Sequence, residues 1–455
     1  MKPRLILFLG LALSAWCFAF TPLWQIPDEP QHYQLARLVA DLGRWPTLSD
    51  VWSATQLERG VYSSLVRNRF WEIRAHRPPP PSLWADTAPD VLLPPIAASP
   101  GYYVVAAGTL RLAGGAGVDS QLRVLRALSV LLGLAELVFV FRLARAAFPR
   151  SPHLATAALC LVALLPMRAY MAAGANSDTL AALVGAAALC TMASWADAPL
   201  TPARGLRVGL LVAASLLTKR TALFLIPTGA LFLLLTWRGA GQRRGVWWLG
   251  AGVAAAGACA PLALWLLARP ALVAPGQVWP YPGAAPGGLL AIRPEWLARP
   301  FSAEAWTPDA LWGYARGLAV AFASFWGAFG WLTVRLGVGW YAALAGLTGA
   351  AGLGLVRGLR RAARPLSGAQ ILVTGAAALA VLQVVGAAVA QGIPQQGRYL
   401  LPAAGPIACC LVAGWSPWLP ARAQRRLPLL VGGALLLLNA VAWGFYIWPA
   451  FHGPA

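Results

Sequence analysis

Apolar runs long enough to cross a lipid bilayer recur along the whole chain, and they restrict its fold more than any other feature. A spanning helix needs roughly 20 apolar residues to cross about 30 Å of hydrocarbon. Such runs lie at 5–24, 121–141, 154–173, 177–196, 205–237, 246–268, 336–356, 369–390, 399–415 and 427–448. Only 11% of the residues are charged, whereas soluble domains carry about 25%. The sequence therefore predicts an all-α polytopic membrane protein, with 1–455 as a single transmembrane domain.

The distribution of arginine predicts the side of the membrane on which each loop lies. Cytoplasmic loops carry an excess of Lys and Arg. Lys2 and Arg4 precede the first run and place the N-terminus in the cytoplasm. Arginine clusters lie where later loops would then return to the cytoplasm, at 142–150, 204–207, 238–244, 357–364 and 422–426. The run 205–237 is too long for one span, so we expect two helices with a turn near Lys219 and Arg220. About eleven spans result, with the N-terminus cytoplasmic and the C-terminus outside.

The first run could also be a cleaved signal peptide. No clean small-residue cleavage site follows it, so we expect a retained first helix.

Two long segments fall on the predicted outer face. Residues 25–120 hold more than half of the acidic residues, and we expect juxtamembrane helices there, including the stretch 101–112, which is too short to span. Residues 269–335 are rich in Pro, Gly and Trp. Their aromatic stretch Leu311–Trp331 is expected to lie as a helix in the membrane interface, where Trp and Tyr are enriched.

The formal net charge of +21 raises the question of a nucleic-acid partner. Many of the arginines lie in short loops between apolar runs, which is the pattern of topology signals, so no nucleic-acid partner is expected. The predicted cytoplasmic loops are too short to form a nucleotide-binding domain. Any substrate is therefore expected to be borne by a membrane lipid or to lie on the outer face.

Two adjacent acids, Asp28 and Glu29, follow the first apolar run directly. Carboxylates next to hydrocarbon are unfavourable unless they pair or take part in chemistry. They could instead begin a solvated loop or cap a helix, because Pro27 and Asp28 form a plausible helix start. His32 shares a face with Asp28 if this segment is helical. Asp28 with His32, or with the later Asp178, would also be a weak signal for a divalent metal, Mg²⁺ or Mn²⁺.

Asp178 is the next acid at a predicted outer helix end, where Ser177 or Asp178 could simply cap the following helix. Lys219, Arg220 and Arg398 also lie on the predicted outer face, against the insertion bias. Such cations could snorkel to lipid headgroups, or they could bind a phosphate at the membrane surface. Carboxylates and cations on one face are the groups needed to move a sugar off a lipid phosphate. A carboxylate would take the proton of the attacking hydroxyl, and cations would stabilise the departing phosphate.

An ordered set of short motifs runs along most of the chain. The set comprises Pro27-Asp28-Glu29-x-x-His32, Pro100-Gly101-Tyr102-Tyr103, Asp178, Leu216-Leu217-Thr218-Lys219, Ser324-Phe325-Trp326-Gly327 and Gln396-Gly397-Arg398-Tyr399. With this set the chain resembles the GT-C superfamily of membrane glycosyltransferases that use polyprenyl-phosphate sugars. It looks closest to a bacterial branch of predicted membrane proteins of unassigned function. The departure at Gly101, where the family has Pro or Leu, loosens the alignment there.

The resemblance implies roles for individual residues. In protein O-mannosyltransferases and the lipid A aminoarabinose transferase, an acid in the first outer loop lies at the reaction centre. This implies catalytic roles for Asp28, Glu29 and Asp178. It also implies that the substrate is bound by a further set, namely His32, Tyr102, Tyr103, Lys219, Arg220, Arg398 and Tyr399. The implied partners are a polyprenyl-phosphate-linked sugar, membrane lipid and a glycan, lipid or protein acceptor.

The expected activity is inverting sugar transfer on the outer face of a bacterial-type inner membrane. A membrane glycan polymerase is an alternative that would also use lipid-linked sugars. A lipid-linked sugar transporter or flippase is another, although paired broken helices or charged residues deep within spans would then be expected. The acids cluster on the predicted outer face, and among them only Glu136 lies clearly in mid-span.

Overall fold

The computed structural model of the chain describes residues 2–81, 94–238, 244–268, 295, 298–361, 365–391 and 395–453. Parts of both predicted outer segments, residues 82–93 and 269–294, lie outside the described residues. The sequence-based predictions for those stretches are therefore left as predictions.

Every predicted apolar run contains helix. The helices are α1 (Pro3–Phe20), α7 (Val118–Ala147), α8 (Pro152–Leu164), α9 (Pro166–Ala172), α10 (Ser177–Trp195), α11 (Pro202–Thr218), α12 (Leu225–Arg238), α13 (Arg244–Ala268), α16 (Val338–Arg360), α17 (Gly368–Gln391), α18 (Ala404–Trp415) and α20 (Leu427–Val441). Within the described residues, nine helical segments are long and apolar enough to cross a membrane, or ten if the bent pair α8 and α9 is one span. The chain is an all-α, multi-pass membrane protein.

The expected total of about eleven spans also counts α11. With 17 residues, this helix is about 25 Å long at 1.5 Å per residue, slightly less than the hydrocarbon thickness. The division of the run 205–237 is confirmed. Helix α11 ends at Thr218, Lys219 is extended, a short 3₁₀ turn η3 covers Arg220–Ala222, and α12 begins at Leu225.

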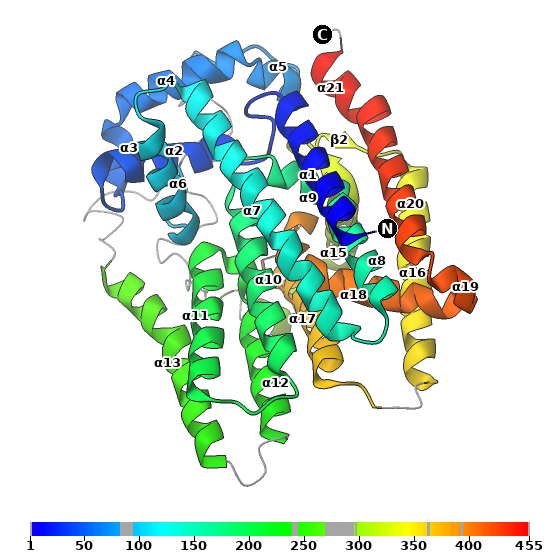
Figure 1. Cartoon of the computed structure of the whole chain (residues 1–455). Coiled ribbons are helices and arrows are strands. Elements are labelled where there is room, and N and C mark those ends of the chain that lie inside the picture. Colours follow the sequence, from blue (N-terminus) through cyan, green and yellow to red (C-terminus); the bar gives the residue numbers. More distant parts are fainter. Residues whose placement is uncertain are drawn as a thin grey trace.

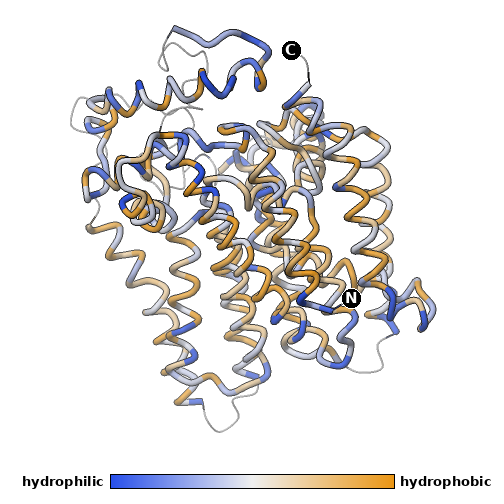
Figure 2. The backbone as a smooth tube through the Cα atoms, turned by 45° about the horizontal axis from the view of Figure 1, so that its top comes forward, coloured by the Kyte–Doolittle hydropathy of each residue, from blue (hydrophilic) through white to orange (hydrophobic). Residues whose placement is uncertain are grey.

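Short helices gather at one end of the bundle (Figure 1). They are α2 (Glu29–Leu42), α3 (Leu48–Ser53), α4 (Thr55–Arg67), α5 (Phe70–Ala75) and α6 (Gly101–Ala113). Figure 2 shows hydrophilic residues concentrated in this region and at the turns of the opposite end, whereas the long helices between them are mostly hydrophobic. Helix α6 has 13 residues, which confirms that this stretch is too short to span.

The stretch predicted as an interfacial helix forms α15 (Pro308–Gly327) and a two-stranded antiparallel hairpin, β1 (Ala328–Phe329) and β2 (Val334–Arg335). Helix α15 is not among the candidate spans of the described chain. Its position in the membrane interface stays a prediction.

Shorter elements complete the C-terminal part. They are η6 (Arg299–Phe301), η7 (Ala303–Trp306), η8 (Gly397–Ala403), η9 (Ser416–Trp418), α19 (Ala421–Gln424), the π-helical turn η10 (Ala442–Ile447) and α21 (Trp448–His452). Helix α8 lies at the centre of the bundle, in contact with α1, α7, α18 and α20. Its residues from Ala155 to Leu164 are all buried, as expected for a helix that is apolar on every side.

Candidate active site

The loop between α1 and α2 carries Asp28 in an unusual backbone conformation. Asp28 has a φ of 66°, and Trp24 in the same loop has a φ of 72°. L-residues rarely adopt this left-handed region, because it is less favourable than the right-handed one by about 1–2 kcal/mol per residue. Asp and Asn tolerate it better than most residues. Such conformations persist where the surroundings fix them, and they cluster at functional sites.

A buried ion pair fixes this loop. Arg126 of α7 binds Glu29 with two hydrogen bonds, from Nε to Oε1 and from Nη2 to Oε2, each 2.7 Å long. Its Nη1 also donates to the carbonyl of Thr21 at 2.8 Å. Glu29 further accepts the backbone N–H groups of Trp24 at 3.0 Å and Ala175 at 3.1 Å. One carboxylate thus joins the loop that carries Asp28 to the loop that precedes Asp178.

Two aromatic side chains hold the loop from the other direction. The hydroxyl of Tyr170 donates to the carbonyl of Gln25 at 2.8 Å and accepts the N–H of Gly330 at 3.0 Å. The indole of Trp331 donates to the carbonyl of Trp24 at 3.1 Å. The loop is therefore tied to α7, α9 and the β1–β2 hairpin.

Four charged side chains meet beside this loop, and we call Asp28, Asp178, Lys219 and Arg398 the charge cluster. Arg398 Nη2 lies 2.6 Å from Asp28 Oδ2, and Lys219 Nζ lies 2.7 Å from Asp178 Oδ1. Arg398 Nη1 lies 3.8 Å from Asp178 Oδ2, which links the two pairs. All four were selected from the sequence. The structure brings them together from four separate parts of the chain.

Asp178 is available to the cluster because another residue caps its helix. The side chain of Asn176 accepts the N–H groups of Asp178 at 3.0 Å and of Thr179 at 3.2 Å. The alternative in which Ser177 or Asp178 is the cap is therefore wrong. Because Asn176 already binds the first N–H groups of α10, the carboxylate of the fully buried Asp178 is left to face Lys219 and Arg398.

Two of the sequence motifs touch each other directly behind Arg398. The N–H of Gly397 donates to the hydroxyl of Ser324 at 2.8 Å. A Cβ atom at position 397 would lie 2.1 Å from the backbone nitrogen of Phe325. Only glycine lets η8 approach α15 this closely, and this approach sets the position of the next residue, Arg398.

Gly101, where the sequence departs from the family pattern, also lies in a close contact between two elements that a larger residue would disturb. A Cβ atom there would lie 2.8 Å from the hydroxyl of Thr218 and 3.0 Å from the carbonyl of Leu217. The start of α6 thus packs against the last turn of α11, immediately before Lys219. The departure fits this close contact.

The predicted aromatic and histidine residues border the cluster. His32 Nδ1 lies 2.8 Å from the hydroxyl of Tyr103, and its ring also contacts Tyr102. The Tyr399 ring lies 5.7 Å from Lys219 Nζ and 5.6 Å from the Arg398 guanidinium. Arg220, by contrast, is exposed and has no ion pair within the described part of the chain.

The cluster alters the protonation of its members outside the spans. Burial alone would raise the pKa of Asp28, but nearby positive charges, led by Arg398, outweigh it and lower that pKa. Burial lowers the pKa of His32 to about 4 and outweighs the opposing effect of Asp28. Burial also lowers the pKa of Lys219, against the opposing effect of Asp178. At neutral pH the site therefore presents an ionised Asp28 beside a neutral His32.

The same geometry does not favour a resident metal ion. Within the described residues no three His, Cys, Asp or Glu side chains are grouped as metal ligands. Asp28 and Asp178 each already face a cation at 2.6 and 2.7 Å. Their negative charge is balanced by Arg398 and Lys219, so these residues fit an ion-pair cluster better than a divalent cation site.

Two buried arginines were not singled out from the sequence. Arg126 binds Glu29, and Arg168 binds Glu136 with its Nε 3.0 Å from Oε2. Glu136, the acid in mid-span, is thus paired within the protein. A lone arginine within an apolar run was the available signal, because a buried charge requires a partner.

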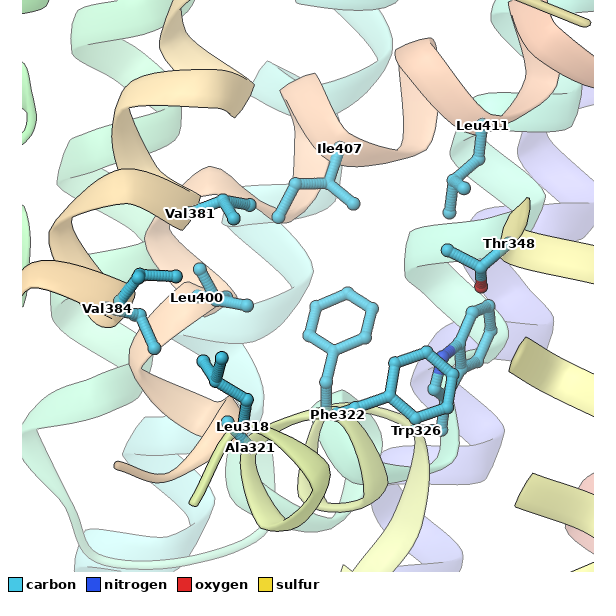
Figure 3. Close-up of a pocket in the computed structure, with 12 residues that line it drawn as sticks. Leu318, Ala321, Phe322, Trp326, Thr348, Val381, Val384, Leu400, Ile407 and Leu411 are labelled. Atoms are coloured by element: carbon cyan, nitrogen blue, oxygen red, sulfur yellow. The ribbon is translucent and has the colours of Figure 1, made fainter. Parts of the chain in front are cut away.

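An apolar groove of about 270 Å³ lies against η8, the element that also carries Arg398 (Figure 3). It is lined by side chains of α15, α16, α17, η8 and α18, among them Phe322, Trp326, Val381, Leu400 and Ile407. Leu400 follows Arg398 by two residues, and the carbonyl of Ala321, another lining residue, lies where a Cβ atom of Gly397 would be. The groove and the charge cluster thus share η8, which contributes Leu400 to the groove and Arg398 to the cluster.

Residues 99–265 match the family model described as dolichyl-phosphate-mannose-protein mannosyltransferase. This confirms, over that part of the chain, the resemblance to polyprenyl-phosphate-dependent glycosyltransferases, and it supports membrane glycosyltransferase activity of the GT-C type. Tyr102, Asp178 and Lys219 lie within the match, whereas Asp28 and Arg398 lie outside it. A comparison with curated protein sequences gives no match.

Two solved structures align with most of this chain at low sequence identity. ArnT from Cupriavidus metallidurans bound to undecaprenyl phosphate aligns with a TM-score of 0.49 at 16% identity, over 96% of this chain and 70% of that chain. The oligosaccharyltransferase of Archaeoglobus fulgidus in the apo form aligns with a TM-score of 0.49 at 13% identity, over 99% of this chain and 55% of that chain.

Proposed function

We propose that this chain is an inverting glycosyltransferase that moves a sugar from a polyprenyl-phosphate donor to a hydroxyl of an extracytoplasmic glycan, lipid or protein. The single observation that carries the proposal is the charge cluster. Two carboxylates and two cations from distant parts of the chain face one another at 2.6 to 3.8 Å. The family match over residues 99–265 supports the same reaction class.

In this proposal Asp28 is the general base. The acceptor oxygen attacks the anomeric carbon, the bond between that carbon and the phosphate oxygen breaks, and Asp28 takes the hydroxyl proton. The lipid leaves as polyprenyl phosphate, which carries one more negative charge than it did in the donor. The lowered pKa keeps Asp28 ionised and ready to accept the proton.

Arg398 and Lys219 would bind the phosphate and stabilise the charge that develops on it. Two nitrogens of Arg398, Nε and Nη1, have no hydrogen-bond partner among the described residues, although the side chain is 96% buried. Donor phosphate would meet these donors and compete with Asp28 for the guanidinium. Binding of the donor would thereby loosen the ion pair of Asp28 and release the base for its task. Asp178 would orient the two cations.

The groove would hold the first part of the polyprenyl chain. Its walls are apolar, so isoprene units could move from the bilayer hydrocarbon into the groove without loss of an apolar environment, and van der Waals packing would hold them there. The proposal places the site on the outer face of an inner membrane, where Asp28, Asp178, Lys219 and Arg398 share one predicted side. It includes no metal ion.

The test uses membranes that contain the wild type or Asp28→Asn, supplied with a panel of polyprenyl-phosphate sugars labelled in the sugar. We expect label to leave one lipid of the panel with the wild type and to stay on the lipid with the variant. Product length would separate single transfer from a glycan polymerase. Label that moves across sealed vesicles while still bonded to the lipid would instead support a transporter and overturn the proposal.

A further inference from the structure

His32 has a buried ring nitrogen that no group in the described chain binds. The side chain is buried, with a relative exposure of 6%. Its Nδ1 meets the hydroxyl of Tyr103 at 2.8 Å, but Nε2 has no hydrogen-bond partner among the described residues. Buried polar atoms are nearly always paired, so an unpaired one next to the charge cluster is a position that a water molecule or a polar group of a ligand would occupy.

The contact with Tyr103 determines which nitrogen carries the proton. Tyr103 is 1% exposed, and the hydrogen bond to His32 is its only one to a described residue. A buried hydroxyl proton needs an acceptor, so Tyr103 donates to Nδ1. In a neutral imidazole the proton then resides on Nε2, which makes this atom a hydrogen-bond donor.

The unpartnered donor belongs to the residue one turn after Asp28, and the charge of Asp28 acts on its imidazole. The N–H of His32 donates to the backbone carbonyl of Asp28 at 2.9 Å, so the two residues are one helical turn apart. The site thus offers a neutral N–H donor and a carboxylate acceptor within one turn. A hydroxyl group matches this pair, because it can accept from Nε2–H and donate to the carboxylate at the same time. A phosphate cannot donate to Asp28, and it already has Arg398 and Lys219.

We propose that His32 is a specificity-determining residue that donates from Nε2 to a hydroxyl of the sugar substrate or acceptor, and that Tyr103 positions its ring for this contact. The inference rests on the proposed glycosyl transfer and names the group that the site selects. Analogues that lack this hydroxyl would leave Nε2–H buried without a partner, which is how a site built for a hydroxyl rejects them.

The first experiment reads the proton position and does not depend on any activity. The chain has only four histidines, so ¹⁵N-labelled imidazole signals of the full-length protein can be assigned by comparison with His32→Gln. We expect the His32 signal of the neutral Nε2–H form at pH 7. Tyr103→Phe should shift it to a mixture of both neutral forms. A pure Nδ1–H form in the wild type would overturn the proposal.

The second experiment separates the two possible sources of the hydroxyl. With the donor identified by the label assay, KM would be measured for donor and acceptor in the wild type, His32→Ala and His32→Gln. We expect His32→Ala to raise one of the two KM values about tenfold. A rise for the acceptor would assign the hydroxyl to the acceptor, and a rise for the donor would assign it to the donor sugar. Glutamine keeps an N–H donor near the position of Nε2 and should stay within about threefold of the wild type.

The outcomes that contradict the proposal are distinct from failure of the proposed function. His32→Gln as impaired as His32→Ala would leave no role for the donor. Equal weakening of bare undecaprenyl phosphate binding by His32→Ala would make the residue a phosphate ligand, and unchanged KM values would remove it from the site. Absence of transfer by the wild type would instead refute the glycosyltransferase, while the imidazole spectrum would still report the donor state of His32.

Discussion

Asp28 and Glu29 are neighbours in sequence, and each meets an arginine, yet the two ion pairs differ in almost every other respect. Glu29 is fully buried, and Arg126 and two backbone N–H groups occupy its carboxylate. Asp28 is one-quarter exposed, and its partner Arg398 keeps two nitrogens without a hydrogen bond to any described residue. A saturated pair holds the fold, whereas an incompletely satisfied pair can exchange its partner for a substrate.

This contrast favours different roles for two acids that could not be distinguished from the sequence. Glu29 was expected to share in catalysis with Asp28. Its position favours a structural role, because any proton transfer at Glu29 would have to displace the bonds that hold the loop. The clearest test of these two roles is to neutralise each acid in turn without changing its shape.

Asp28→Asn is expected to lower the transfer rate about a thousandfold, because asparagine cannot accept the proton. Its thermal unfolding midpoint should stay close to that of the wild type, since asparagine also tolerates the left-handed backbone. Label transfer and thermal unfolding in detergent would measure the two effects. Near-normal turnover by this variant would remove Asp28 from the role of base.

Glu29→Gln is the matched control for Asp28→Asn, and Arg126→Met removes the partner of Glu29. Removing one partner of a buried pair destabilises a fold by about 3–5 kcal/mol, because the other charge stays buried without compensation. Both single variants should therefore unfold at clearly lower temperatures. The double variant should regain part of the loss, since no uncompensated charge remains. Full stability of Arg126→Met would show that Glu29 does not hold the loop.

Lys219→Met tests the part of the charge cluster that is proposed to bind the donor phosphate. Loss of one charged hydrogen bond to phosphate should raise the KM for the donor about tenfold or more. The adjacent Arg220 is exposed and has no ion pair in the described structure, so Arg220→Met should change KM by less than about threefold. Steady-state kinetics with the labelled donor would compare them. Equal effects would mean that the phosphate is bound outside the charge cluster.

The smallest expected effect is that of pH. Nearby positive charges, led by Arg398, lower the pKa of Asp28 below its usual range, and burial lowers the pKa of His32 to about 4. Asp28 is therefore ionised and His32 neutral above pH 5, and the ion pair of Asp28 is lost only as the pH falls through its lowered pKa. The ratio kcat/KM should vary less than about twofold between pH 5 and 8. A titration near pH 6.5 would contradict the assigned states of both residues.

The long helices, the break at Lys219 and the members of the charge cluster could be predicted from the sequence. These features depend on local composition or on charges in unexpected positions, which are visible without knowing any contact. The role of Glu29 could not be predicted in this way. Its partner Arg126 lies 97 residues away, and no spacing rule links two side chains across different helices.

The cap of α10 and the close contact of Gly101 were missed for related reasons. Asn, Ser and Asp are all good caps, so Asn176-Ser177-Asp178 leaves the choice to the backbone geometry. Gly101 is required by the approach of Leu217 and Thr218, more than a hundred residues later in the chain. In both places, packing between distant segments decides between alternatives that the local sequence leaves equal.

The bond between Asp28 and Arg398 joins residues 370 positions apart. A membrane protein is synthesised and inserted from its N-terminus, so Asp28 reaches the membrane long before its partner has been translated. The loop can dock once α7 and α10 are in place, but the charge cluster is completed only when η8 has been made. Under the proposed function, a partly inserted chain that lacks Arg398 would be inactive toward the lipid that surrounds it.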